Sequence, residues 1–85
     1  MTDIRSVLAA RHSVHGDFTD HARITQALKA LIGDKPLTSV QREALEMIMH
    51  KIGRILAGNP NYRDHWIDIC GYAQLVADRC EEPSA

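Results

Sequence analysis

The sequence predicts a small all-α protein, and three observations support this fold class. Its 85 residues are 45% hydrophobic and 25% charged, which is the composition of a folded domain and not of a disordered chain. Apolar residues recur every three or four positions along four segments, as they do on one face of an α-helix. None of these segments shows the strict alternation of a half-buried β-strand. We therefore expect a single helical domain over residues 1–80 and a frayed tail at 81–85.

The first helix is expected over about residues 3–13. Either Thr2 or Asp3 can cap its start, because each side chain can accept a hydrogen bond from the backbone of the first turn. Its apolar residues follow helical spacing: Ile4, Val7 and Leu8. Gly16 interrupts the pattern and separates this helix from the next one.

The second helix is expected over about residues 20–32, with Thr19 or Asp20 as its cap. Its apolar residues recur at intervals of three and four: Ile24, Ala27, Leu28 and Leu31. Gly33 and Pro36 then end the helix, since neither residue type continues a helical pattern well.

The third helix is expected over about residues 39–57. Thr38 and Gln41 match a capping box, in which each side chain bonds to the backbone N–H of the other residue. One face of this helix is apolar: Leu45, Ile48, Ile52, Ile55 and Leu56.

The fourth helix is expected over about residues 60–80, with Asn59 as its cap and Pro60 in its first turn. One face is apolar and is expected to form the core side: Trp66, Ile69, Cys70, Ala73, Val76, Ala77 and Cys80. Cys70 and Cys80 are too far apart along this helix for a disulfide, so we expect reduced thiols in the core. Because the joints between helices are short, neighbouring helices should run antiparallel and form a small four-helix bundle.

Charge and hydropathy argue against several classes of function. The chain has 10 Lys and Arg residues against 11 Asp and Glu residues, a net charge of −1. This balance argues against a nucleic-acid binder, which normally carries a basic excess. No apolar run approaches the roughly 20 residues of a membrane span, and the N-terminus lacks the pattern of a signal peptide. The sequence therefore predicts a cytoplasmic protein with no membrane segment.

Acidic residues on the third and fourth helices indicate either a metal site or charges that only stabilise helix starts and pair at the surface. Glu43 and Glu46 are three positions apart, and Asp64 and Asp68 are four apart, so each pair shares one side of its helix. If the two helices pack antiparallel, the four carboxylates can converge between them. Such a cluster is what Mg²⁺ requires, and helical bundles commonly build metal sites in this way.

The basic residues of the third helix allow two interpretations. Lys51 and Arg54 can neutralise the charge of a bound phosphate. They can equally pair with Asp64 and Asp68 in an internal salt-bridge network that fixes the register of the bundle. In that second case the protein is a non-catalytic accessory or protein-interaction module. Carboxylates open to a pocket would favour the enzyme, and direct pairing without a cavity would favour the module.

Three further features have no single explanation from the sequence. Gly71 in a helix interior needs a packing or ligand-clearance reason, because glycine destabilises a helix by roughly 1 kcal/mol. Tyr72 beside it is either an aromatic residue at the core edge or a stacking surface. The His15-Gly16-Asp17 turn either approaches the acidic site or simply caps a helix. The five histidines match no zinc-binding spacing.

Several blocks of the chain resemble a set of short phage and prophage proteins. They are Arg11-x3-His15-Gly16-Asp17-Phe18, Lys51-x2-Arg54 and Asp64-x3-Asp68-x2-Gly71-Tyr72. That set is in turn distantly similar to the all-α, MazG-like nucleoside triphosphate pyrophosphohydrolases. Those enzymes are helical bundles that form dimers or tetramers. They bind Mg²⁺ through acidic pairs on consecutive helices and cleave between the α and β phosphates.

The resemblance implies roles for individual residues. Mg²⁺ would be held by four carboxylates, Glu43, Glu46, Asp64 and Asp68. Among these, Glu46 and Asp68 would be the catalytic pair. Phosphate or substrate would contact Lys51, Arg54, Tyr72, Arg11 and Asp17. The implied fold is a MazG-like or up-down four-helix bundle that is completed by oligomerisation.

The length of the chain adds an expectation about assembly. A chain of 85 residues buries only about 60–65% of the surface that its unfolded form exposes, so its core is thin. We therefore expect a homo-oligomer. The resemblance to MazG-like enzymes implies that it is a dimer or a tetramer and that its ligand is a nucleotide. A site of such a protein is expected at or near a subunit interface.

Overall fold

The computed structural model describes residues 3–81, and within them every regular element is a helix. The helices are α1 (Ile4–His15), α2 (Phe18–Ile32), α3 (Ser39–Ala57) and α4 (Arg63–Ala77). The prediction of an all-α fold with four helices is therefore confirmed for this part of the chain. None of these helices has the length and apolar character that a membrane span requires.

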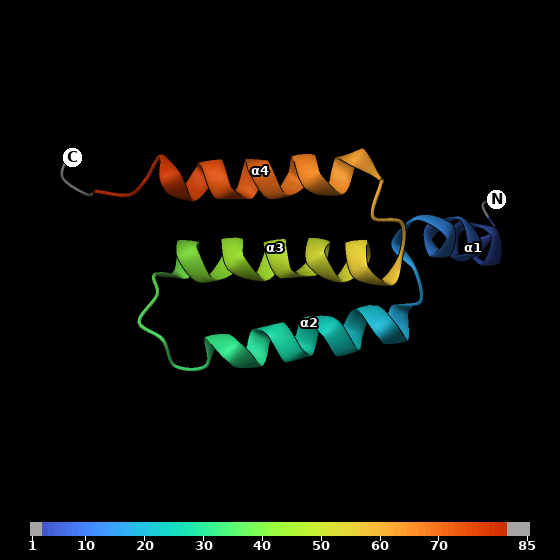
Figure 1. Ribbon diagram of the computed structural model, residues 1–85, viewed down its shortest axis with the longest axis horizontal. Helices are drawn as coiled ribbons and strands as arrows, with labels where there is room; N and C mark the ends of the chain where they lie inside the picture. The colour runs from blue at the N-terminus through green and yellow to red at the C-terminus, as the bar shows by residue number, and fades with distance from the viewer. Residues whose placement is uncertain (1–2, 82–85) are drawn as a thin grey trace.

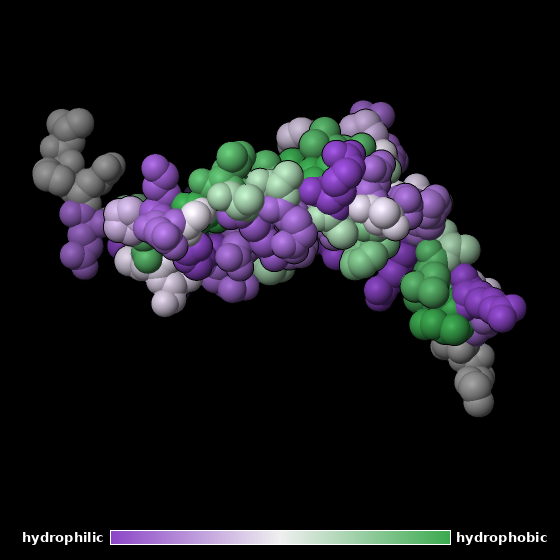
Figure 2. All heavy atoms as spheres, turned by 90° about the horizontal axis from the view of Figure 1, so that it is seen from below, coloured by the Kyte–Doolittle hydropathy of each residue, from purple (hydrophilic) through white to green (hydrophobic). Residues whose placement is uncertain are grey.

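Three of the helices form one layer, with α3 between α2 and α4 (Figure 1). Neighbouring helices run antiparallel because the loops that join them are short. Within the described residues α2 and α4 do not contact each other, so the bundle is open. The remaining helix, α1, lies at one end of the layer against α2 and α3, and Figure 2 shows that it projects to one side.

The joint between α1 and α2 is tighter than the sequence predicts. Asp3 caps α1, since its Oδ1 accepts a hydrogen bond from Arg5 N at 3.0 Å. The helix ends at Gly16, whose φ of 82° lies in the left-handed region that favours glycine. Asp17 follows directly and caps α2 by accepting from Thr19 N at 3.3 Å. The expected caps at Thr19 or Asp20 are therefore wrong, and α2 begins at Phe18.

The third helix runs over Ser39–Ala57, and both bonds of the predicted capping box are present. Gln41 N donates to Thr38 Oγ1 at 3.1 Å, and Thr38 N donates to Gln41 Oε1 at 2.9 Å. Two of the four otherwise unpaired N–H groups at this end of the helix are thereby satisfied.

The fourth helix begins at Arg63 and ends at Ala77, so it is shorter at both ends than expected. Asn59 does not cap it. Its Oδ1 accepts from Asn61 N at 2.9 Å, and this local turn delays the start of the helix. The cap residue is Tyr62, which makes no side-chain capping bond. Of the tail expected at 81–85, residues 82–85 lie outside the described part of the chain.

The predicted core side of α4 is wrong. Five of its seven residues are exposed: Trp66, Cys70, Ala73, Ala77 and Cys80. The side that packs on α3 is instead centred on buried His65 and half-buried Tyr72. The two cysteines are free, as expected, but they lie at the surface and not in the core. Contacts of His65 and Asp68 with the rest of the chain, described below, hold α4 in this rotation.

The buried part of the chain is small and partly polar. Its buried hydrophobic residues are Ile32, Ala44 and Ile55, and its buried polar residues are His21, Thr25 and His65. The core is therefore as thin as the length of the chain predicts. The polar residues in it gather at the end of the layer where α1 docks.

Two glycines let the α1–α2 joint cross the end of α3 at close range. A Cβ atom on Gly16 would collide with the carbonyl group of Ala57. A Cβ atom on Gly58 would lie 2.5 Å from the carbonyl oxygen of Val14. The crossing is held by a hydrogen bond from Asn59 N to Val14 O at 3.1 Å. Backbones this close leave no room for side chains, so both positions require glycine.

Candidate functional site

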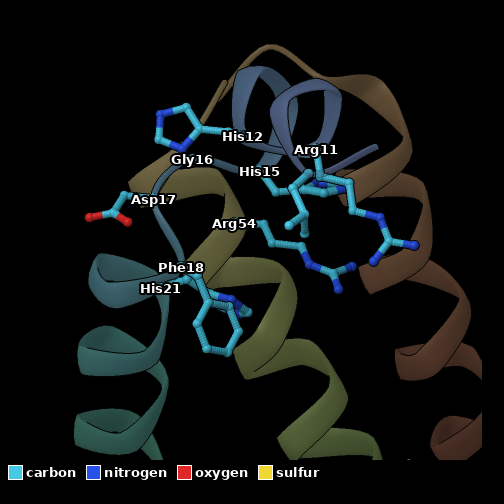
Figure 3. A pocket seen from close by; sticks show the side chains of 9 residues that line it. Arg11, His12, His15, Gly16, Asp17, Phe18, His21 and Arg54 are labelled. Atoms are coloured by element: carbon cyan, nitrogen blue, oxygen red, sulfur yellow. The ribbon is translucent and has the colours of Figure 1, made fainter. Parts of the chain in front are cut away.

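A cavity of about 640 Å³ opens where α1 meets α2 and α3, and we call it the corner pocket (Figure 3). It is lined by Leu8, Arg11, His12, His15, Gly16, Asp17, Phe18, His21 and Arg54. Three of the five residues predicted to bind phosphate lie here, namely Arg11, Asp17 and Arg54. Its volume lies within the range of about 300–1,000 Å³ that is usual for small-molecule sites.

The two arginines reach the pocket from different helices, Arg11 from α1 and Arg54 from α3. Their guanidinium groups lie on the same side of the pocket, whereas the carboxylate of Asp17 points away on the other side (Figure 3). The two ion pairs of residues 3–81 involve neither arginine. The corner pocket therefore holds two positive charges that no carboxylate of the described chain pairs with.

At the corner pocket two histidines contact each other, and one of them, His15, lines the cavity. His15 Nδ1 lies 3.2 Å from His65 Nε2, which is a hydrogen bond with the proton on one of the two nitrogens. Tyr62 packs edge-on against His65, with ring centroids 4.8 Å apart. His65 is almost completely buried, with 2% of its surface exposed. The pair joins the end of α1 to the start of α4.

A third histidine, His21, is buried on the α2 side of the pocket. Its ring contacts those of Phe18 and His50 at centroid distances of 5.8 and 5.5 Å. The space for it comes from Gly53, since a Cβ atom there would collide with the His21 ring. Among the described residues, His21 Nε2 is buried with no hydrogen-bond partner. A buried nitrogen of this kind is costly to leave unpaired.

The pKa values of four histidines are lowered from the ordinary value of 6.5, and we call them the inner histidines: His15, His21, His50 and His65. Burial is the largest cause of the lower pKa at each of them, because it penalises the charged form. The positive charge of Arg54 contributes at all four, and Lys29 precedes it at His50. The inner histidines are therefore neutral at pH 7.

The predicted acidic residues do not form one group. Lys51 Nζ pairs with Asp68 Oδ2 at 3.0 Å, and the Lys51 side chain is only 11% exposed. Asp64 and Glu43 are exposed, and Glu46 is half-buried. Within residues 3–81, no three His, Cys, Asp or Glu side chains lie close enough together to hold a metal ion. These residues as placed in one chain therefore do not fit a Mg²⁺ site.

Of the two interpretations of the basic residues, one fits Lys51 and the other fits Arg54. Lys51 pairs directly with Asp68, as the salt-bridge network requires. Arg54 lies in a cavity and pairs with neither aspartate, as a phosphate-binding residue would. The other predicted phosphate-binding residue, Tyr72, is half-buried between α3 and α4, away from the corner pocket.

Gly71 borders a shallow depression on α4 together with Ile67, Asp68, Tyr72 and Leu75. A Cβ atom on Gly71 would meet nothing within 4 Å. The packing reason expected for this glycine is therefore not found among the described residues of the chain.

The inner histidines could not be recognised as a group from the sequence, where their spacing matches no zinc site. They come from all four helices, and only the tertiary structure brings them together. One sequence signal was available. Gly53 lies in the interior of a long helix, where glycine is destabilising, and such a glycine often marks the close approach of a neighbouring side chain.

Comparison with known proteins finds a family but no assigned activity. A family model described as a domain of unknown function (DUF6378) matches residues 2–80. No curated protein and no solved structure matches the chain. The match supplies no link to phage proteins or to pyrophosphohydrolases, so that resemblance stays a prediction.

Proposed function

Since the chain belongs to the DUF6378 family, a domain of unknown function, we propose a function from the corner pocket itself. The protein binds a phosphorylated small molecule there, and a nucleotide is the class of ligand that we expect. One observation carries this proposal. Arg11 and Arg54 lie on the same side of one cavity, and neither pairs with a carboxylate of residues 3–81.

The chemistry of the wall suits an anion with several oxygens. Guanidinium groups bind phosphate through two parallel hydrogen bonds, and two of them can hold a diphosphate or triphosphate chain. The neutral rings of His15 and His21 line the same pocket and can each supply one N–H donor. Phe18, which is 77% exposed at the rim, offers an aromatic face on which a base can stack.

Hydrolysis is an extension of this proposal that rests on the resemblance to phage and prophage proteins, which are themselves distantly similar to MazG-like enzymes. It assigns Mg²⁺ binding to the acidic residues Glu43, Glu46, Asp64 and Asp68. Because those carboxylates are dispersed in the chain, ligand binding is the part of the function that the geometry supports best. Catalysis is therefore tested by a separate experiment.

Binding is tested by calorimetric titration with inorganic pyrophosphate and with nucleoside triphosphates. Replacing Arg54 by glutamine removes one charge and should weaken binding about 10- to 100-fold, the usual effect of losing a charged hydrogen bond. The matched control is Arg23→Gln, because Arg23 is exposed in a surface pair with Asp20 and lies outside the pocket. Absence of binding, or equal binding by wild type and Arg54→Gln, would refute the proposal.

Catalysis is tested by a screen for pyrophosphate release from standard and modified nucleotides with Mg²⁺ or Mn²⁺. The Asp68→Asn variant is the reference, and its helical content is checked by circular dichroism because Asp68 also pairs with Lys51. Release above this reference supports the hydrolase. If no nucleotide releases pyrophosphate, the proposed hydrolase activity is excluded and a nucleotide-binding accessory protein remains.

A further inference from the structure

We propose that one open side of the helical layer is the interface of a homodimer. The side in question, which we call the apolar face, is the one opposite the corner pocket. On α3 it carries Leu45, Met49, Ile52 and Leu56, which recur at intervals of four, three and four. This stripe contains no charged residue. The occupant that we infer is the same face of a second copy of the chain.

Helical geometry places the apolar face away from the site. At about 100° per residue, Ile52 and Leu56 each lie about 200° from Arg54, on the other side of α3. On α4, Trp66 is about 180° from Leu75, and Leu75 lines a groove with Glu43 on the Arg54 side. Figure 2 shows hydrophobic residues along one side of the layer and mostly hydrophilic residues on the other, with a second hydrophobic group at the end where α1 projects.

The stripes on the two outer helices match that of α3. On α4 the stripe consists of Trp66, Cys70 and Ala73, all exposed. On α2, Leu31 is 77% exposed and lies about 220° from the pocket residue Phe18. These are faces whose apolar spacing predicts a core. Leu56 and Trp66 are nevertheless 66% and 52% exposed, while Met49 and Ile52 are half-buried.

The exposed area agrees with a dimer. A folded monomer of 9.5 kDa is expected to expose about 5,000 Å². This chain exposes 6554 Å², about 1,500 Å² more. A stable interface buries about 800 Å² on each partner, and permanent homodimers bury more. The excess is of the same order as the area that a permanent partner would cover.

A second copy fits this face better than an unrelated partner because the three apolar stripes all lie on one side of the layer and can meet the same three stripes of another copy. The middle helix carries the central stripe, so a two-fold axis that lies between the two layers, at a right angle to α3, would set each stripe against its equivalent. Two such layers would enclose Leu45 and Leu56, which are 38% and 66% exposed in the single chain. Both corner pockets would remain open on the outer sides.

The experiment is analytical ultracentrifugation of the full chain with two leucine variants. Wild type should sediment at twice the chain mass of 9.5 kDa. Leu56→Glu buries a charge in the interface and should weaken association at least about 100-fold. The matched control is Leu75→Glu, because Leu75 is 50% exposed on the other side of the layer. It should associate as wild type does.

Three results would overturn the proposal. They are a wild-type protein that stays monomeric at about 100 µM, undiminished association of Leu56→Glu, and equal dissociation of Leu75→Glu. A second measurement covers the case in which Leu56→Glu does not fold. In wild type, alkylation of Cys70 on the apolar face should be slowed at concentrations where the dimer forms and should recover on dilution. Equal rates at Cys70 under both conditions would also refute the dimer.

Discussion

The same substitution at two glycines of this protein should have opposite effects on stability. Gly53 and Gly71 both lie inside helices, in α3 and α4. A Cβ atom on Gly53 would collide with the buried His21 ring and lie 2.8 Å from Thr25 Oγ1. A Cβ atom on Gly71 would meet nothing within 4 Å. We therefore expect Gly53→Ala to destabilise the protein and Gly71→Ala to stabilise it.

The magnitudes follow from two opposing effects. Replacing glycine by alanine inside a helix stabilises it by about 1 kcal/mol, and this gain applies at both positions. At Gly53 it is opposed by overpacking, which costs about 1–3 kcal/mol. The upper end applies, because His21 and Thr25 are only 8% and 1% exposed and have little space to move into. The free energies of unfolding of the two variants should thus differ by about 2–3 kcal/mol.

The assay is unfolding in urea, monitored by far-UV circular dichroism, of wild type, Gly53→Ala and Gly71→Ala. All three are compared at one protein concentration, because any association would add to the stability. A difference of 2–3 kcal/mol corresponds to about 10–20 °C in Tm for a chain of this length. Equal stability of the two variants, or a Gly53→Ala variant more stable than wild type, would refute the account of the α2–α3 contact.

Three other outcomes are expected. Because folding lowers the pKa values of the inner histidines, the unfolded chain binds more protons than the folded chain. The free energy of unfolding should therefore be highest above about pH 6.5 and should fall toward about pH 5. A urea midpoint that rises on acidification would contradict this. Gly16→Ala should destabilise the protein more than Gly33→Ala in urea unfolding. Both glycines have positive φ, which costs alanine about 1–2 kcal/mol, but only at Gly16 would the added Cβ atom collide with a backbone carbonyl. Chelation of metals with EDTA should leave the affinity for pyrophosphate unchanged, because the positive charge of the corner pocket comes from Arg11 and Arg54. If EDTA lowers this affinity more than about tenfold in a calorimetric titration, a metal is part of the site.

The part of the site that the sequence indicated is its set of charged groups. Arg11, Asp17 and Arg54 were expected to act together on phosphate through a resemblance between blocks of sequence, and they do line one cavity. The pairing of Lys51 with Asp68 was one of two stated alternatives. The histidine pair His15–His65 could not be predicted in the same way, because 50 positions separate its members.

The rotation of α4 shows why helical spacing alone was insufficient. Two adjoining sides of this helix are able to pack, one with Trp66 and small apolar residues and one with His65 and Tyr72. Spacing favours the more apolar side. The chain instead buries the side whose polar atoms find partners, His65 with His15 and Asp68 with Lys51. Unpaired polar atoms would be costly between helices, whereas apolar residues at the surface can still be covered by another chain.

Local sequence patterns are sufficient to give four helices, the capping box at Thr38 and the breaks at Gly16, Gly33 and Gly58. Those features depend on residues within about four positions of one another, so a linear pattern records them. The tertiary structure alone decided which faces meet. Gly16 and Gly58 let two loops cross, and that crossing places α1 where it lines the corner pocket together with α2 and α3. Contacts between residues more than 40 positions apart depend on the three-dimensional path of the chain, and no spacing rule encodes that path.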